Sequence, residues 1–104
     1  MASGILGQSA PSATTNTTVY TVPASKTATF NINIVNTSTG VALVRIAVSA
    51  TGTPATSEYI EYGATILANG GVLERTGIVA NTTKNVVVYS TVSGLSVSVY
   101  GYEE

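Results

Sequence analysis

Apolar and polar residues alternate along most of the chain from Thr17 onward, with the period of two that is typical of half-buried β-strands. No segment carries the 3.6-residue stripe of an amphipathic helix, and strong helix formers are scarce. The pattern is clearest in residues 26–35, where one face carries Ala28, Phe30, Ile32 and Ile34 and the other Thr27, Thr29, Asn31 and Asn33. The alternation predicts strands over residues 17–22, 26–35, 41–50, 58–67, 72–80, 85–90 and 95–102.

Turn-forming residues separate these segments. The cluster 36–40 is rich in Asn, Thr, Ser and Gly, which favours a turn. The run Asn69-Gly70-Gly71 consists of residues that tolerate positive φ, so it predicts a hairpin turn rather than a phosphate-binding loop. Gly77 interrupts the strand that contains it, where we expect a bulge or a bend.

Short strands that recur with turns between them predict an all-β fold. We expect residues 17–104 to form a single domain, an antiparallel β-sandwich of about seven short strands, with a small closed barrel as the alternative. Phe30 and Ile46 are expected at the centre of its core, because both lie on the apolar faces of their strands.

Residues 1–16 are predicted to form an extended N-terminal arm outside the domain. Small residues and Pro11 give this segment no sustained period, and Ile5 and Leu6 are its only sizeable apolar anchors. One interpretation is a mobile tail. The other is an arm that becomes ordered in an assembly, by adding to a sheet edge or by burying Ile5 and Leu6 against a partner.

The composition points to a surface of neutral hydroxyls and amides. The chain has 104 residues, of which 44% are hydrophobic and 9% charged, and its net charge is −1. The scattered cations Lys26, Arg45, Arg75 and Lys84 do not form the basic cluster that binding to nucleic acid requires, so we expect no nucleic-acid partner. We also expect no membrane contact, since no run approaches the roughly 20 apolar residues of a membrane helix. The absence of Cys and of a signal-peptide pattern favours a protein made in the cytosol.

The residues present argue against catalysis. The sequence contains no His, no Cys and no Asp, so it lacks the usual base for a Ser nucleophile and the usual ligands of zinc. Glu58 and Glu61 have the odd spacing that puts two strand residues on opposite faces. A carboxylate pair of Glu58 with Glu74 stays open, and Glu103 is expected in solvent near the C-terminus. We therefore predict no enzyme activity, no metal and no cofactor.

The six tyrosines are the most informative polar residues. In the last predicted strand, Tyr100 and Tyr102 lie on the face opposite the apolar residues Leu95, Val97 and Val99. If that apolar face is core, both rings point outward. Cross-strand packing, a protein interface and stacking against a sugar all remain open. Together with Ile5 and Leu6, these two tyrosines are the candidate interface residues.

Six segments resemble a small β-module of tailed-phage virion structural proteins. They are residues 6–8 (LGQ), 17–24 (TTVYTVPA), 26–29 (KTAT), 44–49 (VRIAVS), 58–62 (EYIEY) and 96–103 (SVSVYGYE), and the likeness covers nearly the whole chain in order. Ser25 stands where that pattern often has Gly after the Pro-Ala pair. The resemblance implies a virion component such as a capsid decoration protein, a fibre or a tail accessory.

The expected function is therefore that of a bacteriophage virion structural protein, above all a capsid decoration or cement protein that acts through protein–protein contacts. Its expected partners are the major capsid protein or tail proteins, together with further copies of itself in a homo-oligomer. The alternative is a tail or fibre module that binds a host receptor or a glycan. A bacterial adhesin module is a third reading, and the missing secretion signal argues against it.

Overall fold

The computed structural model describes residues 3–104, and these residues form eight β-strands and one short 3₁₀ helix. Residues 1–2 of the predicted arm lie outside the described part of the chain. The elements are β1 (Ser3–Ser9), β2 (Thr17–Thr21), β3 (Ala28–Asn36), β4 (Ala42–Ser49), η1 (Thr56–Glu58), β5 (Tyr59–Ile66), β6 (Gly71–Ala80), β7 (Asn85–Ser90) and β8 (Leu95–Glu103).

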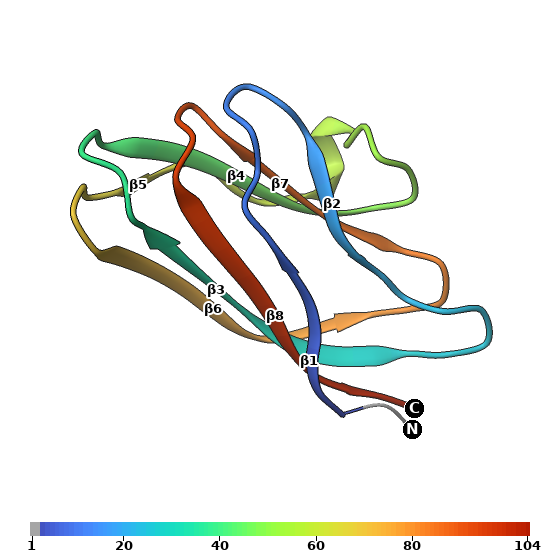
Figure 1. Cartoon of the computed structure of the whole chain (residues 1–104). Coiled ribbons are helices and arrows are strands. Elements are labelled where there is room, and N and C mark those ends of the chain that lie inside the picture. Colours follow the sequence, from blue (N-terminus) through green and yellow to red (C-terminus); the bar gives the residue numbers. More distant parts are fainter. Residues whose placement is uncertain (1–2) are drawn as a thin grey trace.

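The strands form two four-stranded antiparallel sheets, in the orders β1-β8-β3-β6 and β2-β7-β4-β5. The sheets pack face to face, and the start of β1 lies beside the end of β8 at one end of the sandwich (Figure 1). The β-sandwich prediction is confirmed. Apart from the β4–β5 connection, each link between consecutive described strands crosses from one sheet to the other. This strand order is that of an eight-stranded jelly roll.

The core lies between the sheets and follows the predicted alternation. Phe30 is 1% exposed and Ile46 is 0% exposed, so the prediction for the centre of the core is confirmed. In β3 every second residue is buried, and in β8 the buried residues include Leu95, Val97 and Val99. Each buried apolar side chain stabilises the fold by roughly 1.5–3 kcal/mol relative to an exposed one.

The predicted arm is corrected for residues 3–9, which form β1 at the edge of the first sheet. β1 pairs with β8 of its own chain, and Ser3, Ile5 and Gln8 lie opposite Tyr102, Tyr100 and Ser98. The segment lacks alternation because it is short, rich in small residues and interrupted by a bulge after Ile5. Its strand conformation therefore comes from the free hydrogen-bonding edge of β8, which the residues of the segment do not reveal.

The hairpin predicted at Asn69-Gly70-Gly71 is also corrected. Asn69 and Gly70 have the positive φ expected of a turn, at 59° and 102°. However, the turn leads from β5 in one sheet to β6 in the other, and these strands do not pair. The N–H groups of Asn69 and Gly70 instead donate to the carbonyl oxygens of Ser38 and Asn36, at 2.9 and 2.7 Å. The turn is thus bonded to the β3–β4 loop.

The bulges gather on the edge strands. β3 pairs with β8, and β4 with β7, without a register shift, whereas each outer strand of the two sheets is interrupted at least once. The bulge predicted at Gly77 is confirmed in β6, where Asn31 Oδ1 accepts a hydrogen bond from the Gly77 N–H at 2.9 Å. Interrupted edges disfavour the addition of a further strand, so contacts through the faces of the sheets are favoured over contacts through their edges.

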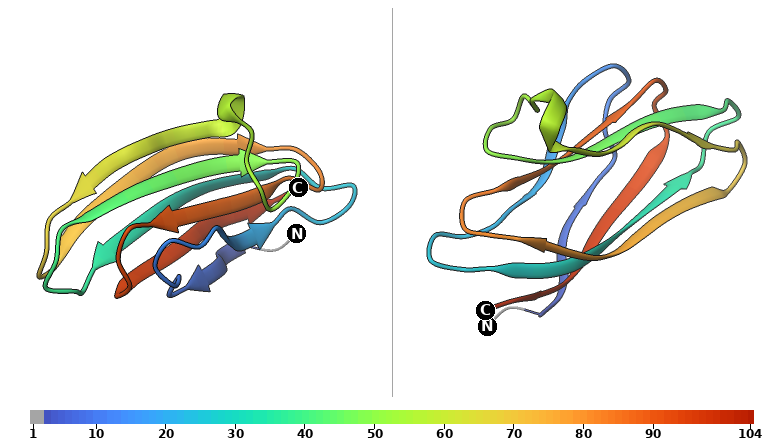
Figure 2. Two further views of the ribbon diagram at one scale, coloured as in Figure 1. Left: turned by 90° about the horizontal axis from the view of Figure 1, so that it is seen from above. Right: turned by 180° about the vertical axis from the view of Figure 1, so that it is seen from behind.

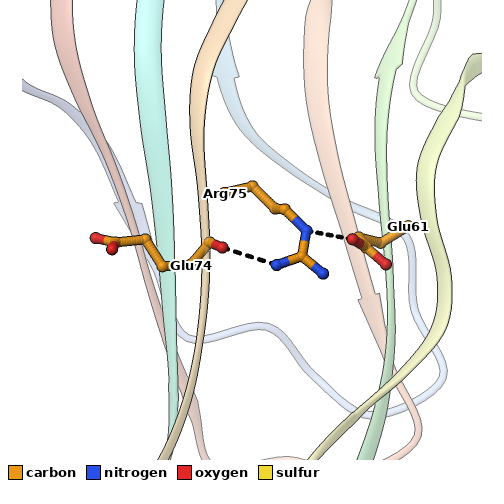
Figure 3. Close-up of polar contacts among 3 residues, drawn as sticks. All are labelled: Glu61, Glu74 and Arg75. Atoms are coloured by element: carbon orange, nitrogen blue, oxygen red, sulfur yellow. Dashed lines mark hydrogen bonds and ion pairs between the residues drawn. The ribbon is translucent and has the colours of Figure 1, made fainter.

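The two long sides of the sandwich are built differently. On one side, β1 and β2 approach so closely that a Cβ atom at Gly7 would lie 2.4 Å from the carbonyl oxygen of Val19. On the other side, Arg75 of β6 bridges the gap to β5, because its Nε donates to a carboxylate oxygen of Glu61 (Figure 3). Its Nη1 also donates to the carbonyl oxygen of Glu74, at 2.8 Å.

The predicted solvent exposure of Glu103 is wrong. Its side chain is 8% exposed, and its carboxylate accepts a hydrogen bond from the hydroxyl of Tyr20, which lies in the opposite sheet. Burial, with the adjacent Glu103 carboxylate, raises the pKa of Tyr20. The Tyr20 ring packs edge-on against Phe30, with a centroid distance of 6.2 Å. The hydrogen bond between Tyr20 and Glu103 thus links the two sheets beside the core.

Candidate functional site

The candidate interface residues are divided between two environments. Ile5, Tyr100 and Tyr102 come together on the outer face of the β1-β8-β3-β6 sheet, where Ile5 lies directly opposite Tyr100. Leu6 points the other way and packs against the core. Ordinary strand alternation accounts for this, and the bulge between Ile5 and Gly7 then places Gly7, opposite the buried Val99, on the inner side as well.

The outer face of this sheet is called the apolar face below. It has exposed side chains at both ends, and Tyr102, Thr29 and Val79 form a row across β8, β3 and β6. Val79 is 64% exposed, Val72 59% and Ile5 58%. Between them lie the amides and hydroxyls of Gln8, Asn31, Asn33, Ser96 and Ser98. Such a surface costs little to desolvate, because hydroxyls and amides are far easier to bury than charges.

Glu74 is the charged side chain of the apolar face, and its carboxylate accepts a hydrogen bond from Tyr100. The Tyr100 hydroxyl donates to Glu74 Oε2 at 2.7 Å, so its ring reaches across β3 from β8 to β6. This hydrogen bond raises the pKa of Tyr100, with a smaller contribution from desolvation. The predicted outward direction of Tyr100 is found, but the partner of its hydroxyl belongs to the same chain.

The outer face of the other sheet carries a tyrosine–arginine cluster, formed by Arg45 of β4, Tyr59 and Tyr62 of β5, and Tyr89 of β7. The Arg45 guanidinium lies 4.4 Å from the centroids of both the Tyr62 and the Tyr89 rings. Tyr59 packs perpendicular to Tyr62 at a centroid distance of 5.0 Å. Register explains the cluster, because Tyr62 and Tyr89 pair with Arg45 from its two neighbouring strands.

A hollow of about 360 Å³ opens beside this cluster, lined by Pro54, Thr56, Tyr59 and Tyr62. The loop that carries Pro54 and Thr56 stands out at one end of the sandwich (Figure 2). Glu58 fastens this loop, since its carboxylate accepts hydrogen bonds from the Ser49 hydroxyl and from the Ala50 and Ala55 N–H groups, at 2.8, 3.0 and 2.8 Å.

The hydrogen bonds to Glu58 have an electrostatic consequence. Those from the backbone N–H groups of Ala55 and Ala50, followed by that from Ser49, lower the pKa of Glu58 to about 2. Glu58 is therefore ionised across the physiological range and acts as an anchor of the loop. It precedes β5 instead of lying within that strand, so the predicted opposite-face relation to Glu61 does not apply.

The carboxylates of the described residues are engaged separately. Glu58 holds its loop, Glu61 pairs with Arg75, and Glu74 accepts from Tyr100 on the outer face of the other sheet. Glu58 and Glu74 thus belong to different surfaces. Within residues 3–104, no three carboxylates gather as ligands for a metal ion.

Sequence reasoning identified Tyr59 and Tyr62 as strand residues but did not connect them with Arg45 or Tyr89. The cluster combines the consecutive strands β4 and β5 with the distant strand β7, and it depends on the pairing register, so no local spacing predicts it. One signal was present, because Arg45 interrupts an otherwise apolar strand at a position whose neighbours Val44 and Ile46 point into the core.

Comparison of the chain with protein-family models, with curated proteins and with solved structures gives no match. Across the described residues, no helix has the length and apolar character needed to cross a membrane.

Proposed function

We propose that this chain is a non-enzymatic structural protein of a bacteriophage particle, and that it decorates the capsid through its apolar face. The observation that carries the proposal is that face itself. It spans four strands, exposes Ile5, Val72, Val79 and Tyr102, and carries a carboxylate that Tyr100 already caps. A neighbouring virion protein can cover the hydroxyls, amides and aliphatic side chains of this surface at little desolvation cost, provided that the Glu74 carboxylate stays hydrated at the rim or meets a cation of the partner.

Two further features support the proposal. The sequence resembles phage virion modules over nearly its whole length, and Ser25, at the position where that pattern often has Gly, adopts a φ of 64°, in the region that glycine favours. Jelly-roll sandwiches also serve as viral capsid and lectin domains, although a shared fold is an analogy and does not define a function.

The test is addition of purified protein to particles that lack this chain, with bound copies counted by densitometry and located by electron microscopy. Many copies on the capsid lattice are the expected result. Val79→Lys should reduce binding at least about tenfold, because a buried charge replaces an apolar contact. Leu43→Lys, on the outer face of the other sheet, is the matched control. Absence of binding, or equal loss with both variants, contradicts the proposal.

A second candidate is a tail or fibre module that binds a host receptor. The observation that favours it is the hollow beside the tyrosine–arginine cluster. A handful of copies at the tail, instead of many on the capsid, distinguishes this candidate in the same electron-microscopy map.

A further inference from the structure

The hollow beside Tyr59 and Tyr62 has the properties of a small binding site. Its volume of about 360 Å³ falls at the lower end of the range for ligand pockets. Its walls are fixed on both sides, since Glu58 ties down the loop with Pro54 and Thr56, and Tyr62 is held between Arg45 and Tyr59. A fixed wall loses little conformational entropy when a ligand binds.

The tyrosines of the site keep free binding capacity. Tyr62 is 65% exposed although neighbours hold its ring on two sides. The hydroxyls of Tyr59 and Tyr62 make no hydrogen bond to any residue from 3 to 104. An exposed ring with a free hydroxyl combines apolar contact area with a polar tip, which suits a ligand that has both an apolar face and hydroxyl groups.

The charge next to the site points to an anion, because Arg45 lies against Tyr62, one of the four lining residues, without itself lining the hollow. The Arg45 guanidinium has no hydrogen bond and no ion pair with residues 3–104, whereas Arg75 is paired with Glu61. The central carbon of the Arg45 guanidinium lies 4.4 Å from the ring centroids of Tyr62 and Tyr89, and its N–H groups are available as donors to a ligand. A cationic ligand is disfavoured, because Arg45 already occupies the space between these two rings. A carboxylate matches the donor edge of a guanidinium.

We propose that this hollow binds a pyranose sugar that carries a carboxylate. The sugar ring packs against Tyr62, its hydroxyls bond to Thr56 and to the tyrosine hydroxyls, and its carboxylate is attracted by Arg45. This goes beyond decoration of a capsid and does not depend on it, because the site lies on the sheet opposite the apolar face.

The experiment is titration of the purified full chain, followed by two-dimensional NMR, with sialyllactose and a glucuronic-acid disaccharide as acidic probes and lactose as the neutral probe. We expect at least one acidic probe to shift the resonances of Tyr59 and Tyr62 in a saturable manner, about tenfold more tightly than lactose. Raising the ionic strength should lower the affinity for the acidic probe and leave the affinity for lactose unchanged. The salt arm tests the charge without any mutation.

Variants separate the contributions of ring and charge. Tyr62→Ala should abolish binding of the probes. Arg45→Gln should reduce the affinity for the acidic probe to that for lactose. Tyr102→Ala, on the apolar face, is the matched control and should change nothing. Circular dichroism checks that each variant is folded. The proposal is overturned by lack of saturable binding to both acidic probes, by equal affinity for lactose, or by equal loss with Tyr102→Ala.

Discussion

The outer faces of the two sheets differ in what they offer a partner, although both sheets have four antiparallel strands and share one core. The apolar face exposes aliphatic side chains among amides and hydroxyls, and its carboxylate is capped by Tyr100. The other face carries Arg45 without an ion-pair partner in the described chain, stacked between tyrosine rings. The first is suited to a broad contact, and the second to a small directional one.

The difference teaches that the fold constrains only half of the side chains. Inward positions must be apolar or have a hydrogen-bond partner, as Glu103 has in Tyr20, because both sheets bury them, while outward positions are free to vary. On β4 the same alternation that buries Val44 and Ile46 presents Arg45 to solvent. On β8 it buries Val97 and Val99 and presents Tyr100. One core therefore supports two surfaces of unlike chemistry.

The largest effect is expected from a substitution in the hydrophobic core that both sheets share. Phe30→Ala should lower the free energy of unfolding by about 3–5 kcal/mol, because the ring is 1% exposed and packs against Tyr20. Chemical denaturation followed by circular dichroism measures this loss. Val35→Ala, at a half-buried position on the outer side of the same strand, serves as the comparison. A loss below about 1 kcal/mol for Phe30→Ala contradicts the assignment of the core.

The next effect concerns the hydrogen bond between Tyr20 and Glu103, which links the two sheets. Tyr20→Phe should destabilise the fold by about 1–3 kcal/mol at neutral pH, because it leaves the buried Glu103 carboxylate without its donor. Thermal unfolding measures the change. Tyr102→Phe removes a hydroxyl that has no hydrogen bond within residues 3–104 and should be neutral. Equal stability of the two variants would mean that the Tyr20–Glu103 bond contributes nothing.

An effect of similar size but more local should disturb the contact between β1 and β2. Gly7→Ala places a methyl group 2.4 Å from the carbonyl oxygen of Val19, so β1 must shift, at a cost of about 1–3 kcal/mol. Hydrogen exchange should then accelerate in β1 and along its pairing with β8, and stay unchanged around Tyr62. Gly40→Ala is the control, since its added methyl group meets no atom within 4 Å. Uniform acceleration through both sheets would show that the faces are not independent.

The smallest effect is local to the hollow and depends on pH. The pKa of Glu58 is lowered from 4.5 to about 2 in the folded chain. Its stabilising contribution is therefore complete above about pH 4.5 and is lost as the pH falls through about 2. Unfolding midpoints measured between pH 7 and pH 2 should decrease over this window. Glu58→Gln should be less stable at pH 7, and its unfolding midpoint should depend less on pH. If the variant and the unmodified chain show the same dependence on pH, Glu58 does not stabilise the loop.

Much of the fold was predictable because its signal is local. Alternation located the strands from β2 to β8 to within a few residues and assigned the inner faces of β3 and β8. Of the candidate site, the outward direction of Tyr100 and Tyr102 followed from the same period. The burial of Glu103 was missed, since its partner Tyr20 is distant in the sequence.

The sequence by itself determined where the strands β2 to β8 form, which side of β3 and β8 is apolar and that Asn69 and Gly70 adopt positive φ, because these depend on each residue and its near neighbours. The tertiary structure alone decided that residues 3–9 complete a sheet, that the turn at Asn69-Gly70 joins two sheets, and that Arg45 lies between Tyr62 and Tyr89. Each of these outcomes depends on a strand edge or a register supplied by a distant segment, and an alternating pattern specifies a face without specifying the partner that lies beside it.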